Sequence, residues 1–158
     1  MSNSNFKIIN AGAGSGKTFS LVLEYLTFLI DPKLELNHKS LLAITFTNKA
    51  VNELKSRILN KLFVLKTNPS EEKIIIDHLK NKLKITDDEI KFRSGLILKK
   101  IIYDYGSFDI ITIDSFTHRI IRTFSRDFKL STDFEVVLDN KEILSDMVDS
   151  IINEVGVK

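Results

Sequence analysis

A stretch near the amino terminus places three of the chain's six glycines directly before a Lys-Thr pair, in the order Ala11-Gly12-Ala13-Gly14-Ser15-Gly16-Lys17-Thr18. A backbone that wraps its N–H groups around phosphates needs glycine wherever a Cβ would hold it away. In the pattern G-x-x-x-x-G-K-[ST], the lysine reaches the β- and γ-phosphates and the hydroxyl group holds Mg²⁺. The stretch therefore predicts a phosphate-binding loop in which Lys17 and Thr18 do the chemistry, with Ala11 in place of the first glycine.

Three short apolar runs rich in Ile and Phe predict the strands that would position this loop: residues 6–9, 41–46 and 108–113. None alternates apolar and polar residues, so each is typical of a strand covered on both faces, as in a parallel sheet. A helical pattern follows each run, namely residues 17–30, a stripe of Ala50, Leu54, Ile58, Leu62 and Leu65, and a stripe of Phe116, Ile120, Phe124 and Phe128. Strand then helix, three times, predicts an α/β fold.

The sequence also contains residues that are typical of helix starts and ends. Asp31-Pro32 should end the first helix, and Thr47 should cap the second. A Lys-rich insert, residues 66–106, predicts two helices, the second opened by a capping box that begins at Thr86. A last amphipathic helix should begin near Asp139, with an apolar stripe of Ile143, Met147, Ile151 and Val155.

Composition sets the broad class of the protein. With 158 residues, 43% apolar and 28% charged, the chain has the make-up of a soluble globular protein. The absence of cysteine excludes a disulfide framework, and the longest apolar stretch, residues 21–30, contains Glu24 and is too short to span a bilayer. We therefore expect a cytoplasmic protein without a membrane partner.

Charge is unevenly distributed along the chain. Residues 131–158 hold seven acidic residues against two lysines, a net charge of −5, which leaves +7 on residues 1–130 because the whole chain carries +2. A basic body of this kind suits a polyanionic partner.

Three motifs, in this order and spacing, resemble those of the UvrD/Rep-like superfamily-1 DNA helicases, and within them the RecB-like branch. The loop AGAGSGKT is their form of Walker A, and LAITFTNKAVNELKSRI, from Leu42, resembles their motif Ia. The third, ITIDSFTHRIIRTF from Ile111, resembles their motif Ib, with Asp114 where a histidine is common. The likeness covers most of residues 5–130.

The resemblance implies a P-loop NTPase fold, a RecA-like parallel sheet flanked by helices, and a motor that hydrolyses ATP with Mg²⁺ to move along single-stranded DNA. It also implies a role in DNA repair and a helicase or nuclease partner subunit. By motif matching, the DNA-contacting residues are Thr45, Phe46, Thr47, Asn48, Thr112 and Ser115. Their chemistry is compatible, since hydroxyl and amide groups bond phosphate oxygens and an aromatic ring stacks on any base.

The hydrolytic half of such a site is missing from the sequence. No apolar run followed by Asp-Glu, the Walker B pattern that binds Mg²⁺ and orients water, occurs in the chain. We therefore expect residues 1–130 to be the first part of an incomplete RecA-like lobe that binds nucleotide without efficient hydrolysis. Residues 131–158 would begin a following subdomain.

Two other interpretations stay open. The chain could be a small complete P-loop NTPase or nucleotide kinase, in which Asp114, at the end of an apolar strand, is the Walker B aspartate. It could also be a nucleotide-binding or DNA-binding module without catalysis.

Overall fold

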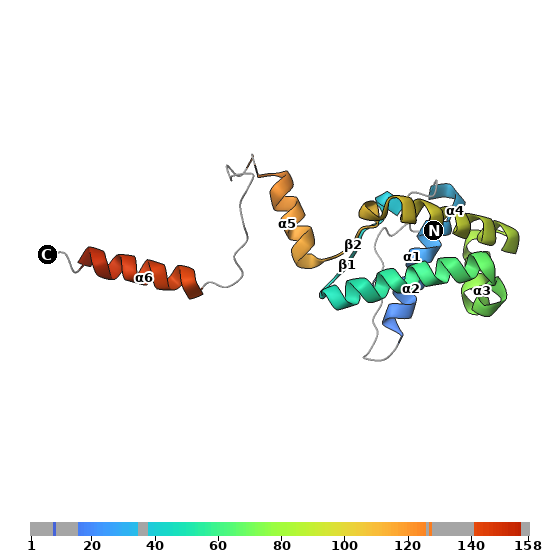
Figure 1. The fold of residues 1–158 in the computed structure, drawn as a ribbon. Helices are drawn as coiled ribbons and strands as arrows, with labels where there is room; N and C mark the ends of the chain where they lie inside the picture. Colours follow the sequence, from blue (N-terminus) through green and yellow to red (C-terminus); the bar gives the residue numbers. More distant parts are fainter. Residues whose placement is uncertain (1–7, 9–15, 35–37, 126, 128–140, 156–158) are drawn as a thin grey trace. The chain divides into compact units, whose positions relative to one another are not determined.

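The computed structural model describes residues 8, 16–34, 38–125, 127 and 141–155 (Figure 1). Contacts divide the chain into two compact units, Met1–Asp114 and Ser115–Lys158. The described part is mainly helical with one small parallel sheet, in agreement with an incomplete α/β domain. Its elements are α1 (Lys17–Ile30), β1 (Ala43–Thr45), α2 (Asn48–Thr67), α3 (Lys73–Leu83), α4 (Asp87–Tyr103), β2 (Ile110–Thr112), α5 (Ile113–Thr123) and α6 (Lys141–Val155).

The two described strands pair in parallel, with Ala43 opposite Ile110, Ile44 opposite Ile111 and Thr45 opposite Thr112. Both strands are three residues long, and Ile113 already belongs to α5 rather than to the predicted strand 108–113. Apart from Ile8, the predicted first strand, residues 6–9, lies outside the described residues.

Coverage of this sheet differs from the expectation that both faces are buried. Ala43 and Ile110 are buried, whereas Ile44, whose side chain points to the opposite face, is 42% exposed. Among the described helices, α2 contacts both strands. For β1, burial on both faces was a wrong prediction, whereas in β2 Ile110 and Thr112 are buried and Ile111 is partly buried.

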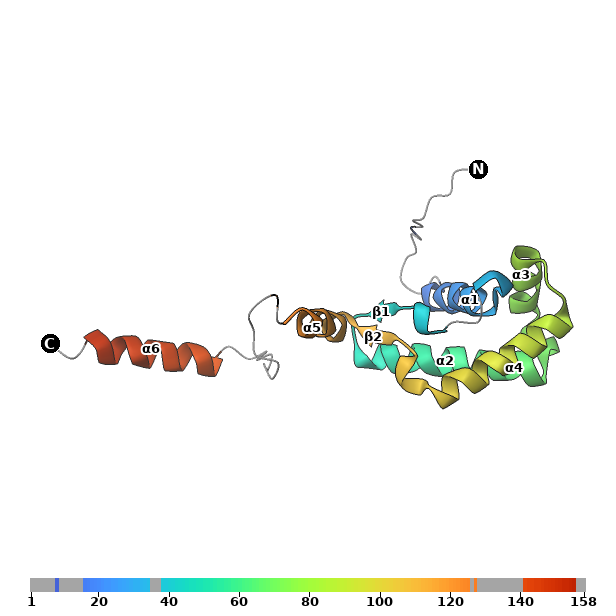
Figure 2. The ribbon, with the colours of Figure 1, turned by 90° about the horizontal axis from the view of Figure 1, so that it is seen from above.

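The core of the first unit lies between α1, α2, α4 and the strands, and α2 provides its centre. The predicted stripe on α2 is confirmed at Leu54, Ile58, Leu62 and Leu65, which are buried, whereas its first member, Ala50, is only partly buried. The predicted cap is confirmed as well, since the Thr47 hydroxyl oxygen accepts a hydrogen bond from the Ala50 N–H at 3.2 Å. α4 lies along α2 in Figure 2 and forms with it the most extensive helix pair of the unit.

The insert, residues 66–106, forms the two predicted helices, α3 and α4, and shares the core with the rest of the unit. Its Arg93 reaches back to the end of α1. The Arg93 Nε donates to the Ile30 carbonyl at 2.7 Å, and Nη2 donates to the Asp31 carbonyl at 2.9 Å. These two bonds satisfy carbonyls that a helix end leaves without intrahelical partners. α1 ends at Ile30, as the Asp31-Pro32 pair predicted.

The capping box at the start of α4 is present as predicted. The Thr86 hydroxyl accepts from the Glu89 N–H at 3.3 Å, and the Glu89 carboxylate accepts from the Thr86 N–H at 2.8 Å. The backbone hydrogen bond from Thr86, followed by the one from its hydroxyl, lowers the pKa of Glu89 below its ordinary value.

This capping box should make folding stability fall at acid pH. Because the folded-state pKa of Glu89 is depressed, its contribution is complete above the unfolded-state pKa of about 4.3 and is lost as pH falls through the folded value. We expect the melting temperature of Glu89→Gln to depend less on pH than that of the wild type between about pH 6 and pH 3. Circular dichroism melts would measure this, and parallel curves for the two proteins would contradict it.

The second unit contains α5 from Ser115 onward, and α6. The predicted buried stripe on α5 does not hold within this unit, since no residue of α5 is buried and the helix ends at Thr123, before Phe124. Phe128 lies outside the described residues. α6 confirms the predicted last helix, and its described apolar side chains are exposed: Leu144, Met147, Val148, Ile151 and Ile152. Among the described helices of both units, none has the length and apolar character needed to cross a membrane.

Candidate nucleotide and nucleic-acid site

The phosphate-binding loop is described from Gly16 onward, and Ala11, Gly12, Ala13, Gly14 and Ser15 lie outside the described residues. Gly16 is the N-cap of α1 and has a φ of +79°, in the left-handed region that favours glycine. Its carbonyl accepts the Ser20 N–H at 2.9 Å, which starts the helix. The last glycine of the pattern therefore turns the chain directly into α1.

The amino-terminal end of α1 has the properties of an anion site. Lys17 and Thr18 form its first two positions and both are exposed. Gly16 provides no side-chain cap, and the first turn holds no acidic residue that would repel phosphate. The helix adds its own partial positive charge at this end. These residues therefore fit a nucleotide phosphate with its Mg²⁺.

Gly16→Ala should test the turn directly. We expect it to destabilise the chain by about 1–2 kcal/mol, because a Cβ is disfavoured at positive φ, although no atom lies within 4 Å of the position that this Cβ would take. The matched control is Gly106→Ala, where φ is not in the left-handed region and the Cβ also meets nothing within 4 Å. Urea titrations compare the two, and equal stabilities would contradict the assignment of strain to Gly16.

Motif Ia occupies the junction of β1 and α2. Thr45 ends β1, and its hydroxyl donates to the Thr47 carbonyl at 3.2 Å. Thr47 is the cap of α2, and Asn48 is the first residue of that helix. Phe46 lies between the two threonines and is 84% exposed. The turn therefore holds its hydroxyl groups by local hydrogen bonds while it presents an aromatic ring to solvent.

Motif Ib begins at the end of the neighbouring strand. Thr112 is the last residue of β2 and stands opposite Thr45 in the parallel register, with its side chain buried. The structure thus brings together two of the predicted DNA-contacting residues from positions 67 apart in the chain. Asp114 and Ser115 follow in the first turn of α5, both exposed, and Ser115 belongs to the second unit.

Sequence reasoning missed Arg93, which holds the end of α1. No local pattern marks it, because its two carbonyl partners lie 62 and 63 positions away along the chain. It also missed Lys55, whose ammonium group lies 5.0 Å from the Tyr105 ring centroid and 5.7 Å from that of Phe108. Arg93 and Lys55 are basic residues within helices, and from the sequence alone their side chains would be expected to face solvent.

A comparison with protein families gives a match to the UvrD/REP helicase N-terminal domain over residues 2–156. The chain belongs to this family. The match extends through nearly all of both units and confirms the resemblance that the three motifs predicted.

Curated relatives point in the same direction. The chain is 33% identical to an ATP-dependent helicase/nuclease subunit of Streptococcus suis over 85% of its length, which is 9% of that protein. It is 32% identical to the protein of the same name from Streptococcus thermophilus over 89% of its length, 10% of that protein. The Natranaerobius thermophilus protein of this name is 42% identical over 48% of the chain, 6% of that protein.

The chain therefore spans a tenth or less of the length of these relatives. No solved structure matches it significantly.

Proposed function

We propose that this chain is the ATP-binding N-terminal part of an ATP-dependent DNA helicase that translocates on single-stranded DNA. The observation that carries the proposal is the left-handed Gly16 turn leading into a helix that begins Lys17-Thr18, in a chain matched to the helicase family over residues 2–156. ATP as the nucleotide is supported by the relatives, whose names call them ATP-dependent.

Each residue of the loop has a proposed role. The backbone N–H groups of residues 11–16 would surround the phosphates, and the Lys17 ammonium group would pair with the β- and γ-phosphates. The Thr18 hydroxyl would hold Mg²⁺, which lowers the charge of the phosphates when bound. The RecA-like arrangement of the whole lobe is part of the same proposal, with residues 1–130 as its first part and 131–158 as the start of the next subdomain.

The proposed path of DNA follows the carboxyl ends of β1 and β2. Thr47, Asn48 and Ser115 would bond phosphate oxygens without reading sequence. Thr45, whose hydroxyl already donates to the Thr47 carbonyl, and Thr112, whose side chain is buried, would instead fix the strand ends from which the other residues project. Phe46 would stack on a base, which its exposure permits.

Phe46→Ala should accordingly weaken single-stranded DNA binding. Stacking contributes about 1–3 kcal/mol per base, so the loss should be roughly 5- to 100-fold in Kd. Fluorescence anisotropy with labelled oligo-dT measures it, and the control is Phe28→Ala, a half-exposed ring on α1. Equal losses in the two variants would speak against a stacking role for Phe46.

Hydrolysis and assembly belong to a longer protein in this proposal. The chain alone would bind nucleotide without efficient turnover, because a Walker B Asp-Glu pair is absent from its sequence. The relatives are named as subunits, which supports a partner protein in a cytoplasmic helicase or nuclease assembly that acts in DNA repair.

The experiment that tests the proposal measures nucleotide binding and turnover on the same sample. A fluorescent ATP analogue should bind in the presence of Mg²⁺, and steady-state ATP turnover with or without oligo-dT should not exceed that of Lys17→Ala. Turnover abolished by both Lys17→Ala and Asp114→Ala would instead favour the small complete NTPase, in which Asp114 is the Walker B aspartate. Absence of nucleotide binding would overturn both.

A further inference from the structure

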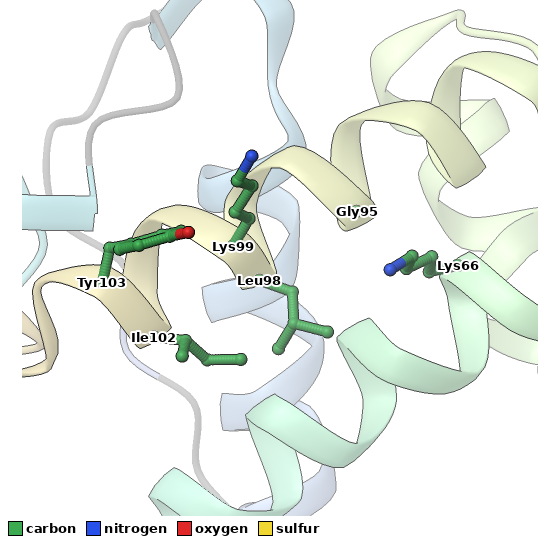
Figure 3. Close-up of a pocket in the computed structure, with 6 residues that line it drawn as sticks. All are labelled: Lys66, Gly95, Leu98, Lys99, Ile102 and Tyr103. Atoms are coloured by element: carbon green, nitrogen blue, oxygen red, sulfur yellow. The ribbon is translucent and has the colours of Figure 1, made fainter.

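A pocket of about 270 Å³ lies in the groove between α2 and α4 and includes Lys66 from the last turn of α2 (Figure 3). Lys66 lines it from α2, and the other lining residues come from α4: Gly95, Leu98, Lys99, Ile102 and Tyr103. The distance from Asn48 to Lys66 along α2 is about 27 Å at the helical rise of 1.5 Å per residue. None of its lining residues belongs to the phosphate-binding loop, motif Ia or motif Ib.

The groove exists because the two helices run antiparallel and α4 has a glycine at the contact. Near the end of α2, the Lys66 stem lies 3.4 Å from the position that a Gly95 Cβ would take. Nearer the start of α2, Lys55 meets Tyr105, just beyond the end of α4. Since Gly95 contributes no side chain, a hollow remains that is lined by the buried Leu98 and the exposed Ile102.

The lining of the pocket combines the apolar side chains of Leu98 and Ile102 with the ammonium groups of Lys66 and Lys99. No lining residue is acidic, and in the part of the chain that the structure describes neither Lys66 nor Lys99 has a carboxylate partner. The Lys99 ammonium group lies 5.7 Å from the Tyr103 ring centroid. An occupant that matches this lining carries an apolar side chain with carboxylates on either side of it.

We propose that the α2–α4 groove, defined by the six lining residues, is the docking site for an acidic amphipathic helix of a partner protein. One apolar side chain of that helix enters the pocket above Leu98. Carboxylates three or four residues before and after that side chain lie on the same face of the helix, and they pair with Lys66 and Lys99.

Two features favour a protein helix over nucleic acid in this groove. Leu98 and Ile102 are aliphatic, whereas single-stranded nucleic acid is held by stacking on aromatic faces. The pocket contains one ring, that of Tyr103, and the Lys99 ammonium group already interacts with it. Charge alone would suit either partner, so the test includes both.

The test uses a fluorescein-labelled helical peptide built from Leu and Glu, with its leucines on one face. Fluorescence anisotropy should show saturable binding to the full chain, and a peptide with serine in place of leucine should not bind. The double variant Lys66→Glu/Lys99→Glu should bind the peptide about tenfold or more weakly. The matched control Lys33→Glu/Lys73→Glu changes the net charge equally at two exposed positions outside the groove and should shift Kd less than about twofold.

Three outcomes would overturn the proposal. The first is that the peptide shows no saturable binding. The second is that peptide binding weakens equally in the groove and control variants. The third is that oligo-dT displaces the peptide and that the groove variant also loses affinity for oligo-dT. The last of these would assign the groove to nucleic acid. Binding of the ATP analogue is measured on every variant and should stay unchanged, so that failure of the groove proposal and failure of the nucleotide proposal give different results.

Discussion

Replacing Lys17 with alanine is expected to weaken binding of a fluorescent ATP analogue by roughly 10- to 100-fold. Hydrogen bonds to charged groups contribute about 1.5–3 kcal/mol each, and each 1.4 kcal/mol is a factor of about ten in Kd. Lys17 is exposed in the first turn of α1 and is not part of the core, so its removal should leave the melting temperature nearly unchanged.

The control for this variant is Lys33→Ala, which removes an exposed lysine beyond the other end of the same helix. Both variants lower the net charge by one, so a general electrostatic contribution to nucleotide affinity would appear in both. An equal loss of affinity in the two would contradict a direct contact between Lys17 and the phosphates. A fall in melting temperature confined to Lys17→Ala would indicate a structural role instead.

Ile58→Ala should have the largest effect on folding. Ile58 is 0% exposed in the middle of α2, and truncation of a buried Ile to Ala costs about 2–5 kcal/mol. Native domains of this size are stable by about 5–15 kcal/mol, so the variant should lose a large share of its stability. Urea titration followed by circular dichroism gives the change in the free energy of unfolding.

The matched control for Ile58→Ala is Ile74→Ala in α3, which removes the same atoms from a side chain that is 72% exposed. It should change stability by less than about 0.5 kcal/mol. Similar losses at the two positions would mean that helix propensity rather than burial determines the result. A comparable fall in stability is not expected for any of the variants proposed for the α2–α4 groove.

The sequence predicted most reliably where local chemistry decides the structure. Thr47 and Thr86 cap the helices that they were expected to cap, and Asp31-Pro32 ends α1 at Ile30. In each case the signal and the structure that it determines lie within a few residues of one another.

Burial was predicted less well where it depends on contacts with residues far away in the sequence. Ile44 lies in an apolar run like that of a fully buried strand, yet its burial depends on which elements cover the second face of the sheet. The apolar positions of α5 likewise form a helical stripe without a buried residue in that helix. Periodicity shows which side of an element is apolar, but it does not show what packs against it.

In the candidate site, too, the features set by local sequence were predictable and those set by distant contacts were not. The Gly16 turn and the exposed Lys17-Thr18 pair follow from the local pattern of the loop. The pairing of Thr45 with Thr112 depends on the sheet register, which no single motif contains. Arg93 could not be found at all, because its role depends on where α4 passes the end of α1.

The Arg93 bonds have a consequence for how the chain could be shortened or recombined. Residues 66–106 interrupt the strand–helix order and resemble a removable module, but they supply core side chains and bind the end of α1: Ile75, Ile76, Leu79, Ile85, Ile90, Arg93, Ile97, Leu98 and Ile101. A chimera that exchanges this segment between relatives therefore inherits a folding constraint. A donor segment without a guanidinium that reaches the Ile30 and Asp31 carbonyls should give a less stable chimera, because two hydrogen bonds at the end of α1 are lost.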